Sequence, residues 1–211
     1  MNYKCNCHKI NFQEKNLTYW ENREVTTDEK DIIDHLSNII IPKNYSILHI
    51  GIGNSFFAEN FCKNNKVYGI TLSKHEILKA KKLNLPNYNF FLCDKYSDEF
   101  KLLIQNKKFD LVIDTNLKSY SCCQISFEFM MKNIFESIKS NGMLITSING
   151  MKWFKKLKPK LSFNFKNLFH FKLKEVEGDK NNILSIKELE VLSNEYNFRL
   201  SYDNKLCYLK K

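Results

Sequence analysis

Short apolar runs alternate with amphipathic, helix-like segments along most of the chain, and this alternation restricts the fold more than any other feature. Five apolar runs read as strands: residues 45–50, 66–70, 88–93, 109–113 and 143–148. Strands separated by helices of this length build βαβ units and a mostly parallel sheet. With 211 residues, the chain is long enough for one such domain with a sizeable core.

The end of the chain breaks the alternation. A helical pattern over residues 186–196 is followed by two strand-like runs, 198–202 and 205–209, around the turn Asp203-Asn204. Two strands joined by so short a turn run antiparallel to each other, so one of them opposes the rest of the sheet. We therefore predict an α/β, Rossmann-like fold with a seven-stranded, mostly parallel sheet, one antiparallel strand and helices on both faces.

The predicted helices lie between these strands and before the first one. Thr26 and Glu29 have the spacing of a capping box, which indicates that the first helix begins there, and Pro42 ends it. Apolar periodicity places the later helices over residues 54–63, 74–83 and 98–105 and around 127–138.

The formal net charge of +10 leaves two interpretations open. A basic surface can bind nucleic acid or an anionic membrane. Alternatively, AT-rich coding produces the same profile, because Lys, Asn, Ile, Phe and Tyr abound while arginine occurs only at positions 23 and 199. The sequence contains no run of about 20 apolar residues, so we predict no membrane span. The N-terminus has no apolar core of signal-peptide length, so we expect a cytoplasmic protein.

Seven cysteines, an odd number, indicate reduced thiols rather than a disulfide framework. The segment Cys5-x-Cys7-His8 has a metal-like spacing, but no second ligand pair at zinc spacing follows it. We therefore predict no metal site.

The stretch ILHIGIGNS, residues 47–55, predicts a ligand loop. Gly51 and Gly53 directly follow the first strand, where open α/β sheets bind ligands, and glycine lets the backbone turn sharply there. Phe56 stands where a dinucleotide fold requires a third glycine, and no Gly-Lys-Ser/Thr follows. The loop therefore disfavours NAD or FAD and excludes a P-loop.

Five segments in this order resemble the motifs of class I S-adenosylmethionine-dependent methyltransferases, over roughly residues 28–211. They are Ile47–Gly53, Val67–Ser73, Phe91–Asp94, Phe109–Asp114 and Ile138–Ile145. The resemblance implies S-adenosylmethionine as the cofactor and an antiparallel seventh strand.

The resemblance also implies individual roles. Gly51 and Gly53 would pack against the methionine part of the cofactor, Asp94 would meet the adenine amino group, and Cys93 would lie beside the ring. Asp114 would lie near the methionine amine or the acceptor. The remaining predicted cofactor residues are His49, Asn54, Thr71 and Leu72.

Two positions depart from the family. His49 stands where the first strand usually carries an acid, and Thr71 stands where an acid after the second strand usually holds both ribose hydroxyls. A threonine hydroxyl cannot accept two hydrogen bonds bidentately as a carboxylate does. A catalytically inactive, cofactor-binding member of the fold is therefore an alternative. The segment Gly69–Ser73 also resembles cyclopropane-fatty-acid synthases, which leaves a lipid acceptor open.

Methyl transfer is an in-line displacement that depends mainly on proximity and alignment, and a base is needed only where the acceptor loses a proton. We predict Asp114 and Tyr120 as the catalytic candidates. Asp114 and Asn149 have no apparent third partner for a metal.

Two segments are predicted to bind the acceptor. Residues 1–27 form a lid with Tyr19, Trp20 and Arg23, and an insertion over 149–184 contributes Asn149 and Trp153. The absence of a separate nucleic-acid domain favours a small-molecule acceptor. In the insertion, lysines alternate with aromatic residues, a pattern that can bind RNA or an anionic lipid surface. An RNA- or lipid-directed methyltransferase is therefore the alternative. The oligomeric state is left open.

Overall fold

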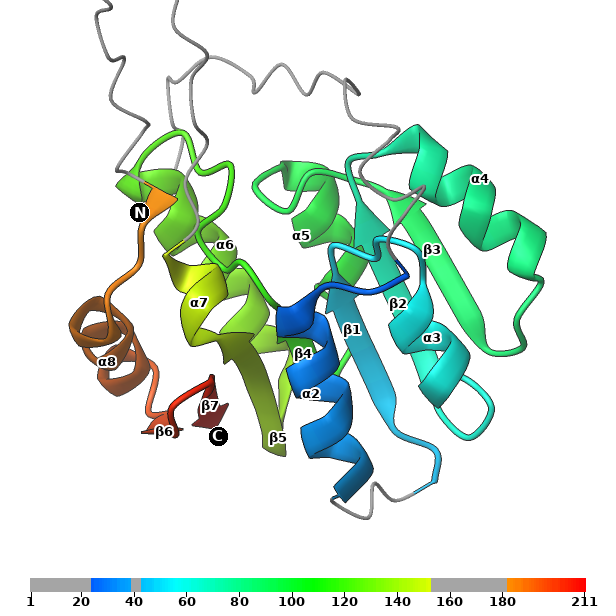
Figure 1. The fold of residues 1–211 in the computed structure, drawn as a ribbon. Coiled ribbons are helices and arrows are strands. Elements are labelled where there is room, and N and C mark those ends of the chain that lie inside the picture. Colours follow the sequence, from blue (N-terminus) through cyan, green and yellow to red (C-terminus); the bar gives the residue numbers. More distant parts are fainter. Residues whose placement is uncertain (1–23, 39–42, 153–181) are drawn as a thin grey trace, which may run out of the picture.

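The computed structural model describes residues 24–38, 43–152 and 182–211 (Figure 1). Seven strands form one sheet in the order β3-β2-β1-β4-β5-β7-β6. Their bounds are β1 Ser46–Ile50, β2 Lys66–Thr71, β3 Tyr88–Leu92, β4 Phe109–Asp114, β5 Ile138–Ser147, β6 Arg199–Tyr202 and β7 Leu206–Lys210.

The first five strands are parallel, and β7 is the reversed strand. It pairs antiparallel with β5 on one side and with β6 on the other. The turn at Asp203 is closed by its own carboxylate, whose Oδ1 accepts the amides of Lys205 and Leu206. The predicted fold class and the predicted terminal hairpin are both confirmed.

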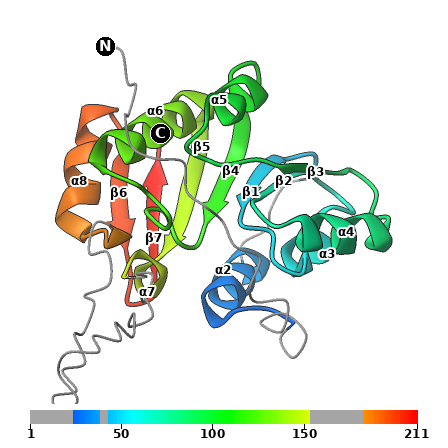
Figure 2. The ribbon, with the colours of Figure 1, turned by 90° about the horizontal axis from the view of Figure 1, so that it is seen from above.

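Helices cover both faces of the sheet, as the view from above shows (Figure 2). α2, α3 and α4 lie on one face, and α5, α6 and α8 on the other. Their bounds are α2 Thr27–Asn38, α3 Phe56–Phe61, α4 Lys74–Leu83, α5 Asp98–Ile104, α6 Gln124–Ser137, α7 Ile148–Met151 and α8 Ile186–Glu195. Within the described residues, no helix is long and apolar enough to cross a bilayer.

The alternation of side chains along β1 builds two cores. Ile47 packs under α2 and α3, whereas Leu48 faces α5 and α6, and both are fully buried. Each side chain buried in this way stabilises the fold by roughly 1.5–3 kcal/mol. A strand that is apolar on both faces is what a central parallel strand requires.

The predicted boundaries of β5 and α3 differ from the structure. β5 begins at Ile138, not at Met143, because Ile138 pairs with Phe109 and the register then shifts before Leu111. The same strand ends at Ser147, whose hydroxyl accepts the amide of Gly150 and so begins α7. The helix predicted over 54–63 covers only Phe56–Phe61.

Candidate functional site

The carboxyl ends of four neighbouring strands meet at one edge of the sheet. The amide of Gly51 donates to the carbonyl of Ile70 at 2.7 Å, and the amide of Cys93 donates to that of Thr71 at 2.9 Å. Asp114 ends β4 beside Ile50 of β1. The chain order reverses between β1 and β4, which is where open α/β sheets bind their ligands. The fold therefore brings the predicted cofactor positions together.

Gly51 opens this edge to a ligand. Its φ is +84°, a region that favours glycine, and a Cβ built on it would meet nothing within 4 Å. Gly53 follows with φ +50°, and Ser55, which begins α3, also has a positive φ of 65°. The Ser55 hydroxyl lies 3.0 Å from that of Tyr88, which ties this unusual conformation to β3.

His49 lies beneath the loop and not on its surface. Its ring is 1 % exposed and packs 4.8 Å from the ring of Phe57. Burial lowers the pKa of His49 to about 3, so the imidazole is neutral. This side chain is therefore placed to support the loop from below.

The carboxyl group of Glu29, a residue of α2, lies beside His49. His49 is the β1 position at which an acid was expected from the resemblance. Oε1 of Glu29 lies 3.8 Å from Nε2 of His49, and the amide of Phe57 donates to the Glu29 carboxyl. Burial raises the pKa of Glu29 to about 8. Both groups are thus mainly neutral at pH 7 and do not form an ion pair. Within the described residues, Oε1 of Glu29 and Nδ1 of His49 have no hydrogen-bond partner.

The end of β2 is also next to a carboxyl group. The hydroxyl of Thr71 donates to Oε2 of Glu76 at 2.6 Å and accepts the amide of Ser73 at 3.0 Å. Glu76 belongs to the first turn of α4. Sequence reasoning assigned Glu29 only to a capping box and did not single out Glu76, although each is the last residue of a Ser/Thr-x-x-Glu segment.

Asp114 is held in a buried ion pair. Nζ of Lys95 lies 2.7 Å from its Oδ2, and the amide of Asn116 donates to its Oδ1 at 3.0 Å. The same ammonium donates to the carbonyls of Asn116 and Leu117 at 3.0 and 2.9 Å. Lys95, which the sequence did not single out, thus fixes the loop that follows β4.

Tyr96 strengthens this loop contact, since its hydroxyl donates to the carbonyl of Ser119 at 2.8 Å. Burial raises the pKa of Tyr96 well above the usual tyrosine value. Tyr120 comes next, half-buried and with φ 61°, a strained conformation for a residue with a side chain. The catalytic candidate Tyr120 therefore stands at the end of a well-anchored loop.

The other predicted positions are spread over the same edge. Asp94 is half-buried, and its Oδ1 accepts the amide of Tyr96 at 2.9 Å. Cys93 and Asn54 are buried, and Leu72 is half-buried. Burial raises the pKa of the Cys93 thiol, so it behaves as a neutral group.

The predicted acceptor segments are only partly described. Asn149 is exposed in α7, just beyond β5. The amide of Leu184 donates to the carbonyl of Met151 at 2.8 Å, so the described ends of the insertion leave and rejoin the domain at one place. The remaining predicted acceptor residues, Tyr19, Trp20, Arg23 and Trp153, lie outside the described residues.

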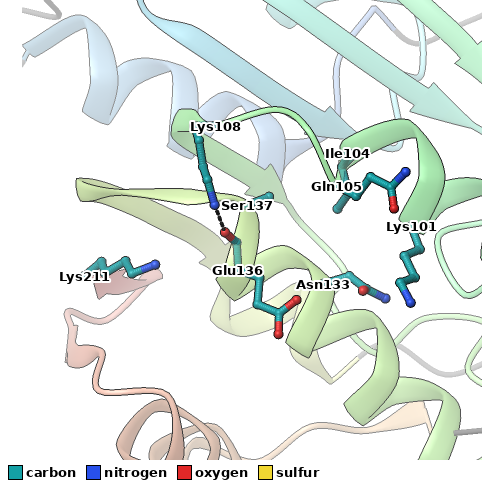
Figure 3. A pocket seen from close by; sticks show the side chains of 8 residues that line it. All are labelled: Lys101, Ile104, Gln105, Lys108, Asn133, Glu136, Ser137 and Lys211. Atoms are coloured by element: carbon teal, nitrogen blue, oxygen red, sulfur yellow. Dashed lines mark hydrogen bonds between the residues drawn. The ribbon is translucent and has the colours of Figure 1, made fainter. Parts of the chain in front are cut away.

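Among the described residues, no group of three His, Cys, Asp or Glu side chains could hold a metal ion. A hollow of about 390 Å³ lies at the opposite, amino edge of the sheet, between α5 and α6 (Figure 3). Two of its lysines cap the end of helix α6, because Lys108 donates to the carbonyl of Glu136 and Lys211 to that of Ile138. This hollow is therefore separate from the glycine loop.

No protein-family model and no curated protein matches the sequence. Among solved structures, the fold is similar to N-methyltransferase NodS from Bradyrhizobium japonicum WM9 in complex with S-adenosyl-L-homocysteine. The TM-score is 0.57 and the identity 11 %, over 91 % of this chain and 94 % of that chain.

It is also similar to the Burkholderia thailandensis 1,6-didemethyltoxoflavin-N1-methyltransferase, solved with bound 1,6-didemethyltoxoflavin and S-adenosylhomocysteine. That match has a TM-score of 0.58 and 12 % identity, over 92 % of this chain and 80 % of that chain. A third similar structure is the cyclase SpnF, with a TM-score of 0.53 and 16 % identity over 87 % and 63 % of the two chains. The strand order and these similarities together show that the chain has the class I S-adenosylmethionine-dependent methyltransferase fold.

Proposed function

We propose that this protein transfers a methyl group from S-adenosylmethionine to a small-molecule acceptor. The observation that carries the proposal is Gly51, whose Cα faces open space at the edge where the strand order reverses between β1 and β4. A ligand can approach the backbone there closely, as a nucleoside-containing cofactor requires. Two similar structures were solved with S-adenosylhomocysteine, which supports the same cofactor here.

The donors and acceptors at this edge fit that cofactor. Its positively charged sulfonium supplies the methyl group when it is bound. Gly51 and Gly53 leave room for its methionine part, and the carboxylates of Asp94 and Glu76 lie at the ends of β3 and β2. Carboxylates attract cations and accept hydrogen bonds from hydroxyl and amino groups.

The protein's contribution to the reaction is mainly alignment. Both carboxylate oxygens of Asp114 are engaged, one by Lys95 and one by Asn116, so we assign it a structural role in fixing the loop after β4. Tyr120, at the end of that loop, remains the candidate for contact with the acceptor. Holding donor and acceptor atoms in line supplies much of the acceleration of such a displacement.

A small molecule is the proposed acceptor because one similar structure, the 1,6-didemethyltoxoflavin-N1-methyltransferase, holds the small molecule 1,6-didemethyltoxoflavin. The RNA-directed alternative rests on the insertion, whose residues 153–181 lie outside the described residues. The lipid-directed alternative rests on the insertion and on the resemblance of Gly69–Ser73 to cyclopropane-fatty-acid synthases.

Calorimetric titration of the purified protein with S-adenosylhomocysteine, with NAD as the control ligand, tests the cofactor assignment. We expect micromolar binding of S-adenosylhomocysteine and none of NAD. A methyl-release assay over a panel of small acceptors then tests transfer. Binding without turnover on any acceptor would favour the inactive, cofactor-binding alternative, and the absence of binding would contradict the proposal.

A further inference from the structure

The loop after β4 ends in two adjacent cysteines, Cys122 and Cys123, whose sulfur atoms lie 3.8 Å apart. Both side chains are half-buried, whereas the other cysteines of the described residues, Cys62, Cys93 and Cys207, are buried. Buried structural thiols are inert, while thiols that a reagent can reach are open to oxidation and exchange. Within the described part of the chain, this pair therefore holds the thiols most open to modification.

Neighbouring hydroxyl groups hold the pair in this arrangement. The thiol of Cys122 donates to Oγ of Ser126 at 3.3 Å, and the Ser126 hydroxyl donates to the carbonyl of Cys123 at 3.0 Å. The hydroxyl of Ser121 donates to the same carbonyl at 2.7 Å. Cys123 is also the N-cap of α6, a helix of 14 residues. The N-terminus of a helix favours the thiolate, which is the nucleophilic form of cysteine.

The pair is connected to the candidate site. Tyr120, which has a positive φ of 61°, lies two residues before Cys122. The charge of a Cys122 thiolate is one of the causes that raise the pKa of Tyr96, so the two side chains are neighbours. The Tyr96 hydroxyl in turn donates to the carbonyl of Ser119 at 2.8 Å. A chemical change at Cys122 therefore reaches the loop that carries Tyr120.

We propose that Cys122 and Cys123 are a modification site, at which a reversible disulfide forms and changes the position of Tyr120. The effect on methyl transfer rests on the proposed function, whereas formation of the crosslink does not. The oxidant is a low-molecular-weight disulfide, such as glutathione disulfide.

The crosslink forms in two exchange steps. The thiolate of one cysteine attacks a sulfur of glutathione disulfide and releases one glutathione. The second protein thiol then attacks the protein sulfur of the mixed disulfide and releases the other glutathione. Two protein thiols are thus oxidised to one disulfide, one glutathione disulfide is reduced, and the two thiol protons end on the two glutathione molecules.

The backbone must move for this ring to close. The peptide bond between the two residues is trans, which sets their Cα atoms about 3.8 Å apart, whereas the Cα atoms of a disulfide are usually about 4.4–6.8 Å apart. The required rotation falls between Tyr120 and the first turn of α6, so the crosslink displaces Tyr120. Disulfides closed against their preferred geometry are readily reduced, which makes the modification reversible.

Mass spectrometry of one tryptic peptide tests the crosslink. Cleavage after Lys118 and Lys132 releases residues 119–132, whose only cysteines are Cys122 and Cys123. After incubation of the purified protein with excess glutathione disulfide, this peptide is expected to lose two hydrogens and to resist alkylation. Dithiothreitol should restore both thiols. A peptide with both thiols still alkylated, or one that carries glutathione without closing the ring, would overturn the proposal.

Matched variants show whether the loss of two hydrogens comes from this pair. Cys122→Ser and Cys123→Ser each remove one of the two sulfurs and should abolish it. Cys62→Ser makes the same change at a buried position on the opposite face of the sheet and should crosslink like the wild type. Thermal unfolding of each variant checks that it is folded.

The displacement of Tyr120 is measured on the crosslinked protein in two ways. Amide hydrogen exchange over residues 115–123 should differ between the crosslinked and reduced forms, and equal exchange would overturn the displacement. Methyl transfer should fall by about 10- to 100-fold and return with dithiothreitol, because a misplacement of about 1 Å can cost this much. Cys122→Ser should keep its activity in glutathione disulfide.

The two proposals can fail separately. Methyl transfer that is unchanged in the crosslinked protein would overturn the effect on the reaction while leaving the proposed function intact. A wild-type protein that does not bind S-adenosylhomocysteine would overturn the proposed function, and the peptide mass and the hydrogen exchange would still decide the crosslink.

Discussion

His49 and Glu29 couple the stability of the domain to pH through two opposite shifts. Glu29 has its pKa raised from 4.5 to about 8. Its contribution to the free energy of unfolding is therefore fully present below pH 4.5 and is lost as pH rises through 8. His49 has its pKa lowered from 6.5 to about 3, so its contribution is present above pH 6.5 and is lost as pH falls toward 3. Between pH 4.5 and 6.5 the two slopes cancel.

Glu29→Gln is therefore expected to remove the decline in stability on the alkaline side. Between pH 6.5 and 8, the wild type should lose about 2 kcal/mol relative to this variant, since one pKa unit corresponds to 1.36 kcal/mol. Urea unfolding at several pH values measures the difference. Glu59→Gln, on the exposed face of α3, should follow the wild type. Parallel pH profiles for Glu29→Gln and the wild type would contradict the assignment.

Gly150 is a second residue whose identity is fixed by its surroundings. A Cβ at this position would overlap the carbonyl oxygen of Thr115, so α7 can pack against the loop after β4 only through glycine. Gly150→Ala should cost about 1–3 kcal/mol, as overpacking does. Asn149→Ala, at the exposed neighbouring position, is the control for urea unfolding. Equal free energies of unfolding for the two variants would show that the loop after β4 can move to admit the added Cβ without loss of stability.

At the scale of elements, three helix starts share a Ser/Thr-x-x-Glu segment but use its glutamate differently. Each helix has its glutamate amide bonded to the Ser or Thr hydroxyl, at Thr26, Ser73 and Ser185. In α8, whose start lies away from the glycine loop, the carboxylate of Glu188 completes a reciprocal capping box with Ser185. In α2 and α4 that carboxyl contacts the ends of β1 and β2.

This difference explains which part of the candidate site was predictable. Gly51, Asp94 and Asp114 follow strands directly, so the period of the apolar pattern was enough to place them at one edge. Glu29 and Glu76 could not be assigned in this way, because their spacing equally predicts a capping box. Their contacts depend on how α2 and α4 pack on the sheet, which a local pattern does not encode.

In the loop after β4, Lys95 bonds both the Asp114 carboxylate and two backbone carbonyls, and Tyr96 adds a further contact. Lys95→Met should destabilise the protein by about 3–5 kcal/mol, because it leaves the carboxylate of Asp114 buried without its cation. Lys95→Met combined with Asp114→Asn should recover part of that loss. Urea unfolding reports both effects, with Lys101→Ala on the exposed face of α5 as the control. A single variant as stable as the double variant would argue against a buried charge.

For the whole molecule, alternation of strands and helices and one short turn were sufficient to predict a seven-stranded sheet with one reversed strand. The prediction failed at the two ends of β5, where residues 139–142 interrupt the apolar pattern inside the strand and Ile148 continues it beyond the strand. There, the pairing of Ile138 with Phe109 and the capping of α7 by Ser147 decide the boundaries. Both depend on partners that lie far away or on the opposite side of a turn.

The insertion is expected to be dispensable for folding of the sheet. A variant in which residues 153–181 are replaced by a short Gly-Ser linker should unfold with a free energy within about 1 kcal/mol of the wild type, because loop closure depends weakly on loop length. It should still bind S-adenosylhomocysteine but lose methyl transfer. Urea unfolding and calorimetry test these expectations, and loss of the cooperative transition would contradict them.

The hydrogen bond between Leu184 and Met151 has an evolutionary consequence. Because this bond joins the two described ends of the insertion, a replacement of the residues between them can keep both attachment points to the domain where they are. If the proposed function holds, selection can then alter acceptor choice while the cofactor site is inherited unchanged. Grafting the corresponding segment of a distant homologue between Met151 and Leu184 would then test whether acceptor specificity can be exchanged.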